Sequence, residues 1–223
     1  MLQNTNTGRH AAVQDNQERA KRLVPTIILT VLSMIQALAL EIYWTRAVGL
    51  EVLWSGGWDA IIAWMQLVAG LVSILIIWVV YVSFVLRFTW LPSLSEMIMP
   101  FLIGILEFAA IAMMHPQTLA LWIVLVAVAF LATLFTGHQT VIAARREPAN
   151  AYFFAQLEAP TWRNYRESLI AIALMLLLVA AGWLLNSAVP TIIALMIVVA
   201  ALTYQFYQIK HYWLHSISAQ SKE

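Results

Sequence analysis

The chain has 223 residues, of which 62% are apolar and only 10% are charged, and its mean hydropathy of +0.82 is far above that of a water-soluble protein. This composition excludes a disordered chain, and a net charge of +1 provides no basic excess for binding nucleic acid. Cysteine is absent, which excludes a disulfide scaffold, thiol redox chemistry and thiolate metal sites. The composition therefore predicts an all-α integral membrane protein.

Six apolar segments are long enough to cross a bilayer. A spanning helix needs about 20 residues, because the hydrocarbon core is about 30 Å thick and a helix rises about 1.5 Å per residue. Residues 1–22 are then a polar tail, which we expect to be mobile and to become helical only near its end, and residues 210–223 form a second tail. Between the tails, residues 23–209 form the membrane domain. The predicted spans are about 23–44, 60–86, 93–114, 117–143, 168–185 and 189–209.

Local signals mark several ends of these spans. Pro25 suits the first turn of the first helix, where its missing N–H costs nothing. Ser93 and Glu96 have capping-box spacing at the start of the third helix. Only residues 186–188 separate the fifth span from the sixth, so these two helices should form a tight hairpin.

The lysines and arginines predict the orientation, because positively charged loops are retained on the cytoplasmic side. With six spans, all but one of the twelve lie on the side of both termini, and the opposite side holds only Arg46. We therefore predict a bundle of six transmembrane helices with the N- and C-termini cytoplasmic, in the plasma (inner) membrane.

Two links between spans are rich in aromatic residues. The link between the fourth and fifth spans also carries four arginines, which suits anionic lipid headgroups; docking of a cytosolic partner is the alternative. Its candidate contact residues are Arg145, Arg146, Trp162, Arg163 and Arg166. The link at 45–59 has tryptophans around a Gly-Gly pair, which predicts a short interfacial helix, with a ligand-binding loop as the alternative.

Glu107 is the central ionisable residue, within the third span. A charged side chain at the bilayer centre costs about 2.5–3.5 kcal/mol, so such residues usually face a bundle interior or a wet cavity and tend to be functional. Glu96 lies on the same helix face within about 20°, unless Pro100 rotates the helix. This spacing predicts an ion pathway from the cytoplasmic edge to the centre. The structural alternative is that Glu107 is protonated and bonds a neighbouring helix, while Glu96 only caps its own.

The possible hydrogen-bond partners of Glu107 are polar and not basic. They are Gln36 and Glu41 on the first span, Gln66 on the second and Thr133 on the fourth, and we place Gln36, Glu41 and Gln66 on the ion pathway with the two glutamates. An acid without a basic partner favours proton or cation handling over a static ion pair.

Three histidines, His138, His211 and His215, lie towards the predicted cytoplasmic face, and three imidazoles could hold a metal. No aspartate, cysteine or HExxH pattern accompanies them, so we expect interfacial side chains, and neither a metal nor another cofactor. The sequence also has no nucleophile elbow, phosphate loop or dinucleotide fingerprint.

Small residues recur every four positions on the fourth span, at Ala129, Thr133 and Gly137. Such a ridge allows close helix packing, either within one chain or between subunits. Few polar groups lie within the spans, so a single protomer is poorly equipped to enclose a hydrophilic cavity. We therefore expect a pore shared by a homo-oligomer. The sequence thus predicts an oligomeric ion channel or a proton or cation transporter. The alternatives are a non-transport scaffold that recruits lipid or a partner through residues 145–166, and a lipid-acting membrane enzyme.

Overall fold

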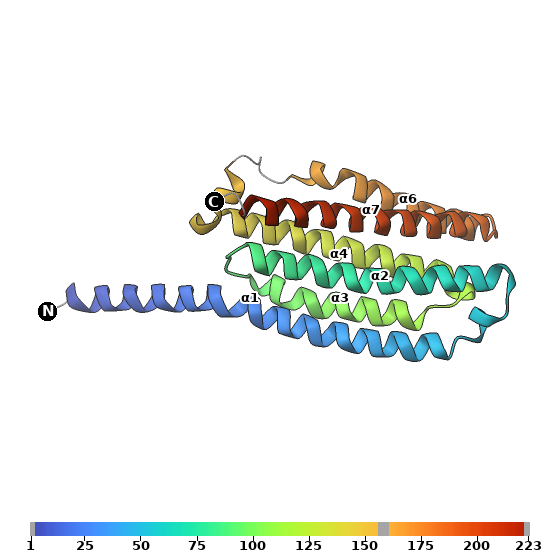
Figure 1. The fold of residues 1–223 in the computed structure, drawn as a ribbon, viewed down its shortest axis with the longest axis horizontal. Helices are drawn as coiled ribbons and strands as arrows, with labels where there is room; N and C mark the ends of the chain where they lie inside the picture. Colours follow the sequence, from blue (N-terminus) through green and yellow to red (C-terminus); the bar gives the residue numbers. More distant parts are fainter. Residues whose placement is uncertain (1–2, 156–160, 221–223) are drawn as a thin grey trace.

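The computed structural model describes the backbone of residues 3–155 and 161–220. Side chains are described for residues 15, 16, 18–155 and 161–210. All regular structure in the described residues is helical (Figure 1). The six long helices are α1 (Gln3–Val48), α2 (Gly57–Arg87), α3 (Leu94–Ala112), α4 (Leu119–Arg145), α6 (Arg166–Leu184) and α7 (Val189–Gln220). Each contains a stretch long and apolar enough to cross a membrane, which confirms the predicted all-helical membrane fold.

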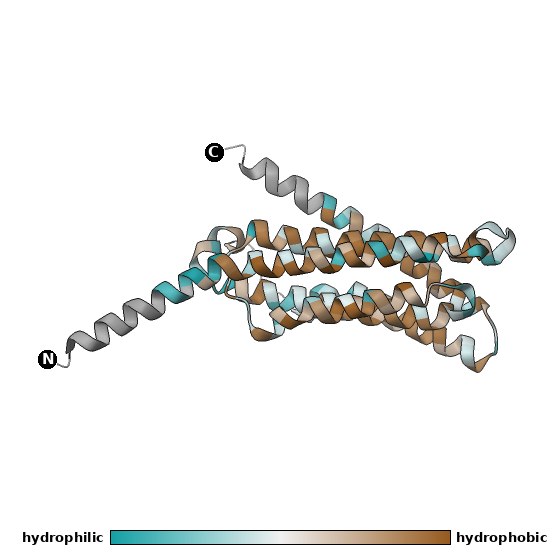
Figure 2. Cartoon of the chain, turned by 90° about the horizontal axis from the view of Figure 1, so that it is seen from below, coloured by the Kyte–Doolittle hydropathy of each residue, from teal (hydrophilic) through white to brown (hydrophobic). Residues whose placement is uncertain are grey.

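The bundle has two distinct ends. We call the end at which α1 begins and α7 ends the termini end; it also holds the link 88–93 and residues 146–155 and 161–165 of the link between α4 and α6 (Figure 1). The hairpin end holds the links 49–56, 113–118 and 185–188. Polar colours gather towards the ends of the bundle and brown, apolar colours dominate its length (Figure 2), as expected for helices surrounded by lipid.

The long helices form a closed ring. Going round it, α1 packs on α2, α2 on α7, α7 on α6, α6 on α4, α4 on α3 and α3 on α1. In Figure 1, α1 and α3 lie along one side, α6 and α7 along the other, and α2 and α4 between them. The main hydrophobic cluster inside the ring includes fully buried Ala39, Ile123, Met175 and Leu195, and a smaller cluster of Ile28, Leu32 and Tyr81 joins α1 to α2.

The first helix is longer than predicted. It begins at Gln3, so the polar tail continues the helix and projects beyond the bundle (Figure 1). The placement of Pro25 in a first turn was wrong, because Pro25 lies inside α1, where it removes one backbone hydrogen bond. The extension contacts the rest of the chain through Lys21, whose Nζ lies 2.9 Å from a carboxylate oxygen of Glu147 and 3.3 Å from one of Glu18.

Turns at the hairpin end follow from local residue choice. The link after α1 contains a single 3₁₀ turn, η1 (Glu51–Trp54), within the segment where a short interfacial helix was predicted; its place at the membrane interface stays a prediction. Gly56 is the residue before α2 and Gly57 is its first residue. Both have a φ of 76°, which only glycine adopts readily. The predicted hairpin between α6 and α7 is confirmed, and Asn186 takes a φ of 47° within its turn.

A buried asparagine joins the links at the termini end. Asn150, the last residue of the 3₁₀ turn η3 (Pro148–Asn150), donates from Nδ2 to the carbonyl oxygens of Thr89 at 2.6 Å and Ala144 at 2.7 Å. Its Oδ1 accepts from the N–H of Thr89 at 3.0 Å. These bonds fix the α2–α3 link against the end of α4.

Candidate functional site

The central polar contact of the bundle joins Glu107 on α3 to Gln36 on α1. Both side chains are buried, at 5% and 4% exposure. The Nε2 of Gln36 donates to both carboxylate oxygens of Glu107, at 3.2 Å to Oε1 and 2.9 Å to Oε2. The carboxylate is therefore held by an amide, which polarises it without adding a neutralising charge.

Glu107 lies closer to the hairpin end than the sequence indicated. The helix starts at Leu94 and ends at Ala112, so Glu107 is about 20 Å from the first residue and about 8 Å from the last, at 1.5 Å per residue. The shorter path from the carboxylate out of the hydrocarbon region therefore leads to the hairpin end.

A glycine sets the approach of the two helices that carry the pair. Gly104 faces Ile35 of α1 so closely that a Cβ added at this position would overlap the Ile35 Cγ2. Small residues allow such contact where lipid supplies no hydrophobic driving force between helices. The close approach brings Gln36, next to Ile35, within hydrogen-bond distance of Glu107.

A small cavity lies beside Glu107, between α2, α3 and α4. Its volume of about 40 Å³ is sufficient for about two water molecules. Apart from Glu107 and Ser73, its lining is almost wholly hydrocarbon. Other residues around it include Gly70, Ile74, Ala110, Met114, Trp122, Ala129 and Phe130.

Several buried polar atoms near this cavity have no hydrogen-bond partner within the described residues. They are both amide atoms of Gln66, the Nε1 of Trp122 and the Oε1 of Gln36. Gln66 is fully buried, and it lies one helical turn before Gly70 on the face of α2 that lines the cavity. An unpaired buried polar group costs about 1–3 kcal/mol, so several of them in one region indicate a polar site and not only a packed core.

Glu96 lies in a separate polar cluster at the start of α3. The predicted capping box is confirmed: the Oε2 of Glu96 accepts from the Ser93 N–H at 2.7 Å and from its hydroxyl at 2.9 Å. Its Oε1 accepts from the Thr140 hydroxyl of α4 at 3.0 Å. The two carboxylates of α3 thus bond opposite neighbours, Glu96 on α4 and Glu107 on α1, about 16 Å apart along the helix.

Two further residues of the predicted pathway and partner set lie apart from the pair. Glu41 is exposed at the hairpin end, on a shallow surface shared with Arg46. The Nη2 of Arg46 donates to the carbonyl of Met114 at 3.2 Å, so this cation sits just past the end of α3, where the helix dipole favours it. The hydroxyl of Thr133 donates to the Ala129 carbonyl of its own helix at 2.9 Å.

The small-residue ridge of α4 faces the inside of the chain at both of its ends. Ala129 lines the cavity beside Glu107. A Cβ added at Gly137 would lie 3.7 Å from Phe84 of α2, an ordinary contact. These two positions therefore serve packing within one protomer.

Most predicted contact residues of the 145–166 link are exposed at the termini end. Arg146, Arg163 and Arg166 are exposed, as is Trp162 at 46%. Arg145 is partly buried, and its guanidinium carbon lies 5.6 Å from the ring centre of Phe154, at the end of the short helix α5 (Ala151–Phe154). The link thus presents cations and an indole beside the apolar bundle.

His138 packs in an aromatic cluster. Its ring centre lies 4.5 Å from that of Trp162 and 5.5 Å from that of Tyr165, both in the 3₁₀ turn η4 (Trp162–Tyr165). The side chains of His211 and His215 lie outside the described residues. Within the described part, His, Cys, Asp and Glu side chains form no group of three that could hold a metal.

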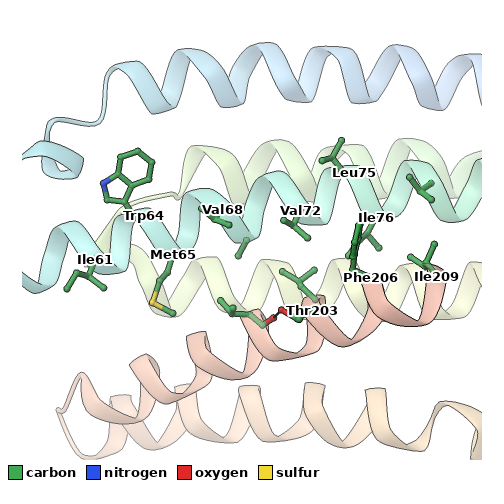
Figure 3. A pocket seen from close by; sticks show the side chains of 14 residues that line it. Ile61, Trp64, Met65, Val68, Val72, Leu75, Ile76, Thr203, Phe206 and Ile209 are labelled. Carbon is green, nitrogen blue, oxygen red and sulfur yellow. Dashed lines mark hydrogen bonds between the residues drawn. The ribbon is translucent and has the colours of Figure 1, made fainter. Parts of the chain in front are cut away.

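A larger hollow of about 620 Å³ runs between α2 and α7 (Figure 3). Trp64, Met65 and Val72 line it from α2, and Phe206 lines it from α7. Thr203 supplies its one hydroxyl, and none of its lining residues is charged. This groove suits hydrocarbon and not a hydrophilic substrate, so the polar cluster at Glu107 is the stronger site.

Comparison of the chain with models of protein families, with curated proteins and with solved structures finds no match. We therefore infer the function from the geometry of the Glu107 site.

Proposed function

We propose that this protein moves protons or other cations across the membrane, with Glu107 as its central ionisable site. The observation that carries the proposal is the buried Gln36–Glu107 pair beside a cavity of about 40 Å³. Intramembrane acids are expensive and mark ion pathways when they face an interior cavity. Glu96, with its donors from Ser93 and Thr140, is here a structural residue at the start of α3.

The proposal includes the orientation derived from charge, with both termini cytoplasmic in the plasma (inner) membrane. The hairpin end then faces the outside, and Glu107 is nearer to the outer surface. The homo-oligomer stays a prediction from the sequence.

The test is ion flux into liposomes that contain the purified protein, under an imposed membrane potential. We expect Glu107→Gln to abolish most of the flux, because the amide cannot change charge. The control is Glu41→Gln, the same exchange at an exposed carboxylate of α1, which should leave the flux unchanged. Equal flux from the wild type and Glu107→Gln, at unaltered folding, would remove Glu107 from the pathway.

The exposed aromatic and basic surface of the 145–166 link favours a second candidate function, a non-transport scaffold that recruits anionic lipid. Its test is the amount of anionic phospholipid that copurifies with the protein in mild detergent. Under this reading, Arg163→Gln with Arg166→Gln lowers the bound lipid, and no ion flux is found. The matched control is Arg46→Gln at the hairpin end.

A further inference from the structure

The oxygen atoms around Glu107 are too few to hold a dehydrated metal cation. Hard cations such as Ca²⁺ take six to eight oxygen ligands, and K⁺ filters use rings of carbonyl oxygens. Here both carboxylate oxygens already accept from Gln36, and the hydroxyl of Ser73 donates to the Ala69 carbonyl of its own helix at 2.8 Å. A proton needs only one oxygen lone pair and a neighbouring water, so it fits this small, mostly hydrocarbon cavity.

One polar side chain of α2, Gln66, lies between the cavity and the hairpin end. Gln66, Gly70 and Ser73 are spaced four and three residues apart, which places them on one face of α2. Gly70 and Ser73 line the cavity, and Gln66 lies a turn further towards the hairpin end, with both amide atoms unpartnered in the described residues. The indole N–H of Trp122, also without a described partner, adds a donor from α4.

In the other direction, the polar surroundings of α3 are interrupted. The next carboxylate towards the termini end is Glu96, about 16 Å away along the helix. Its oxygens already accept three hydrogen bonds from Ser93 and Thr140. Between the two glutamates, buried Ile103 and Pro100 occupy the helix.

We infer that the species bound at Glu107 is the proton and not a metal cation, and that it arrives from the hairpin end along the Gln66–Ser73 face of α2. This inference rests on the proposed function and names its substrate. A protonated water in the cavity transfers its proton to a carboxylate oxygen of Glu107, which leaves a neutral water and a neutral carboxylic acid. The charge is thereby removed from an apolar site where an ionised group is costly.

Two variants test the route without touching the carboxylate. Ala129→Leu fills the cavity, and its control is Ala37→Leu, the same exchange at an exposed position of α1. Gln66→Leu removes a buried amide that has no described partner. We expect it to raise the unfolding temperature, because replacing an unpaired polar group by an apolar one is favourable, and to lower proton flux. A merely structural Gln66 would give no loss of flux.

The experiment compares two fluxes in the same proteoliposomes: proton uptake, read with an internal pH dye under an imposed potential, and Na⁺ uptake down a Na⁺ gradient. We expect proton flux without Na⁺ flux. Glu107→Gln should abolish it, Ala129→Leu and Gln66→Leu should lower it severalfold, and Ala37→Leu should leave it unchanged.

The possible failures separate the two proposals. Na⁺ flux that is lost in Glu107→Gln would overturn the proton assignment and leave the transport function standing. Proton flux that survives in both Ala129→Leu and Gln66→Leu would overturn the route. No flux of either ion from the folded wild type would overturn the transport function together with this inference.

Discussion

The two glutamates of α3 have the same side chain and opposite surroundings. Glu96 lies at the helix start and accepts three hydrogen bonds, two from Ser93 and one from Thr140. Glu107 lies among apolar residues, accepts from the single amide of Gln36, and borders a cavity. Glu96 is also close to the N-terminal end of the helix, where the dipole favours a negative charge.

Under the proposed function, this difference separates an acid that stabilises the fold from an acid that exchanges protons. At Glu96 both carboxylate oxygens accept hydrogen bonds, which tie the start of α3 to Ser93 and to α4. Glu107 accepts from one amide only, and under the proposed function it binds a proton delivered through the adjacent cavity. Burial alone does not distinguish the two, since both are 5% exposed.

The largest expected effect on stability comes from removing the carboxylate of Glu96. Glu96→Ala leaves the Thr140 hydroxyl and the Ser93 N–H without their acceptor, and we expect a loss of about 3 kcal/mol in the free energy of unfolding. Glu107→Gln should cost less than about 1 kcal/mol, because an amide can still bond the amide of Gln36. Unfolding of both variants in the same detergent, by heat or denaturant, measures the contrast. A Glu107→Gln variant as unstable as Glu96→Ala would make Glu107 a structural residue as well.

A smaller effect is expected from separating the helices that form the Glu107 pair. Gly104→Ala places a methyl group against Ile35, and such overpacking costs about 1–3 kcal/mol. The variant should also lower ion flux, because Gln36 moves away from Glu107. Gly137→Ala is the control, since its added methyl group meets Phe84 at 3.7 Å, an ordinary contact. Equal stability of the two alanine variants would show that the α1–α3 contact adapts freely.

Much of the fold follows from the sequence, because span length and local capping are properties of contiguous residues. The six spans, the capping box of Ser93 and the hairpin at Asn186 belong to this group. The long start of α1 was missed, because polar residues carry no apolar pattern even where they continue a helix.

The site was only partly predictable. Gln36 was among four possible partners of Glu107, and the sequence could not choose between them. In helices that are apolar nearly all round, hydrophobic periodicity does not select the inward face. The pairing of Glu96 with Thr140, the contact at Gly104 and the cavity all depend on which faces of distant helices meet.

The smallest expected effect comes from removing a single hydrogen bond, the one from Thr140 to Glu96. Thr140→Val keeps the shape of the side chain and removes the only bond described between Glu96 and α4, so we expect a loss of about 1 kcal/mol and unchanged ion flux. Thr133→Val is the matched control, since its hydroxyl bonds only the Ala129 carbonyl of its own helix, and valine there should cost a few tenths of a kcal/mol at most. Both are read by the same unfolding measurement. A Thr140→Val variant that kept its stability but lost flux would place Glu96 on the ion pathway, as its spacing from Glu107 first indicated, and would remove the division between the two carboxylates.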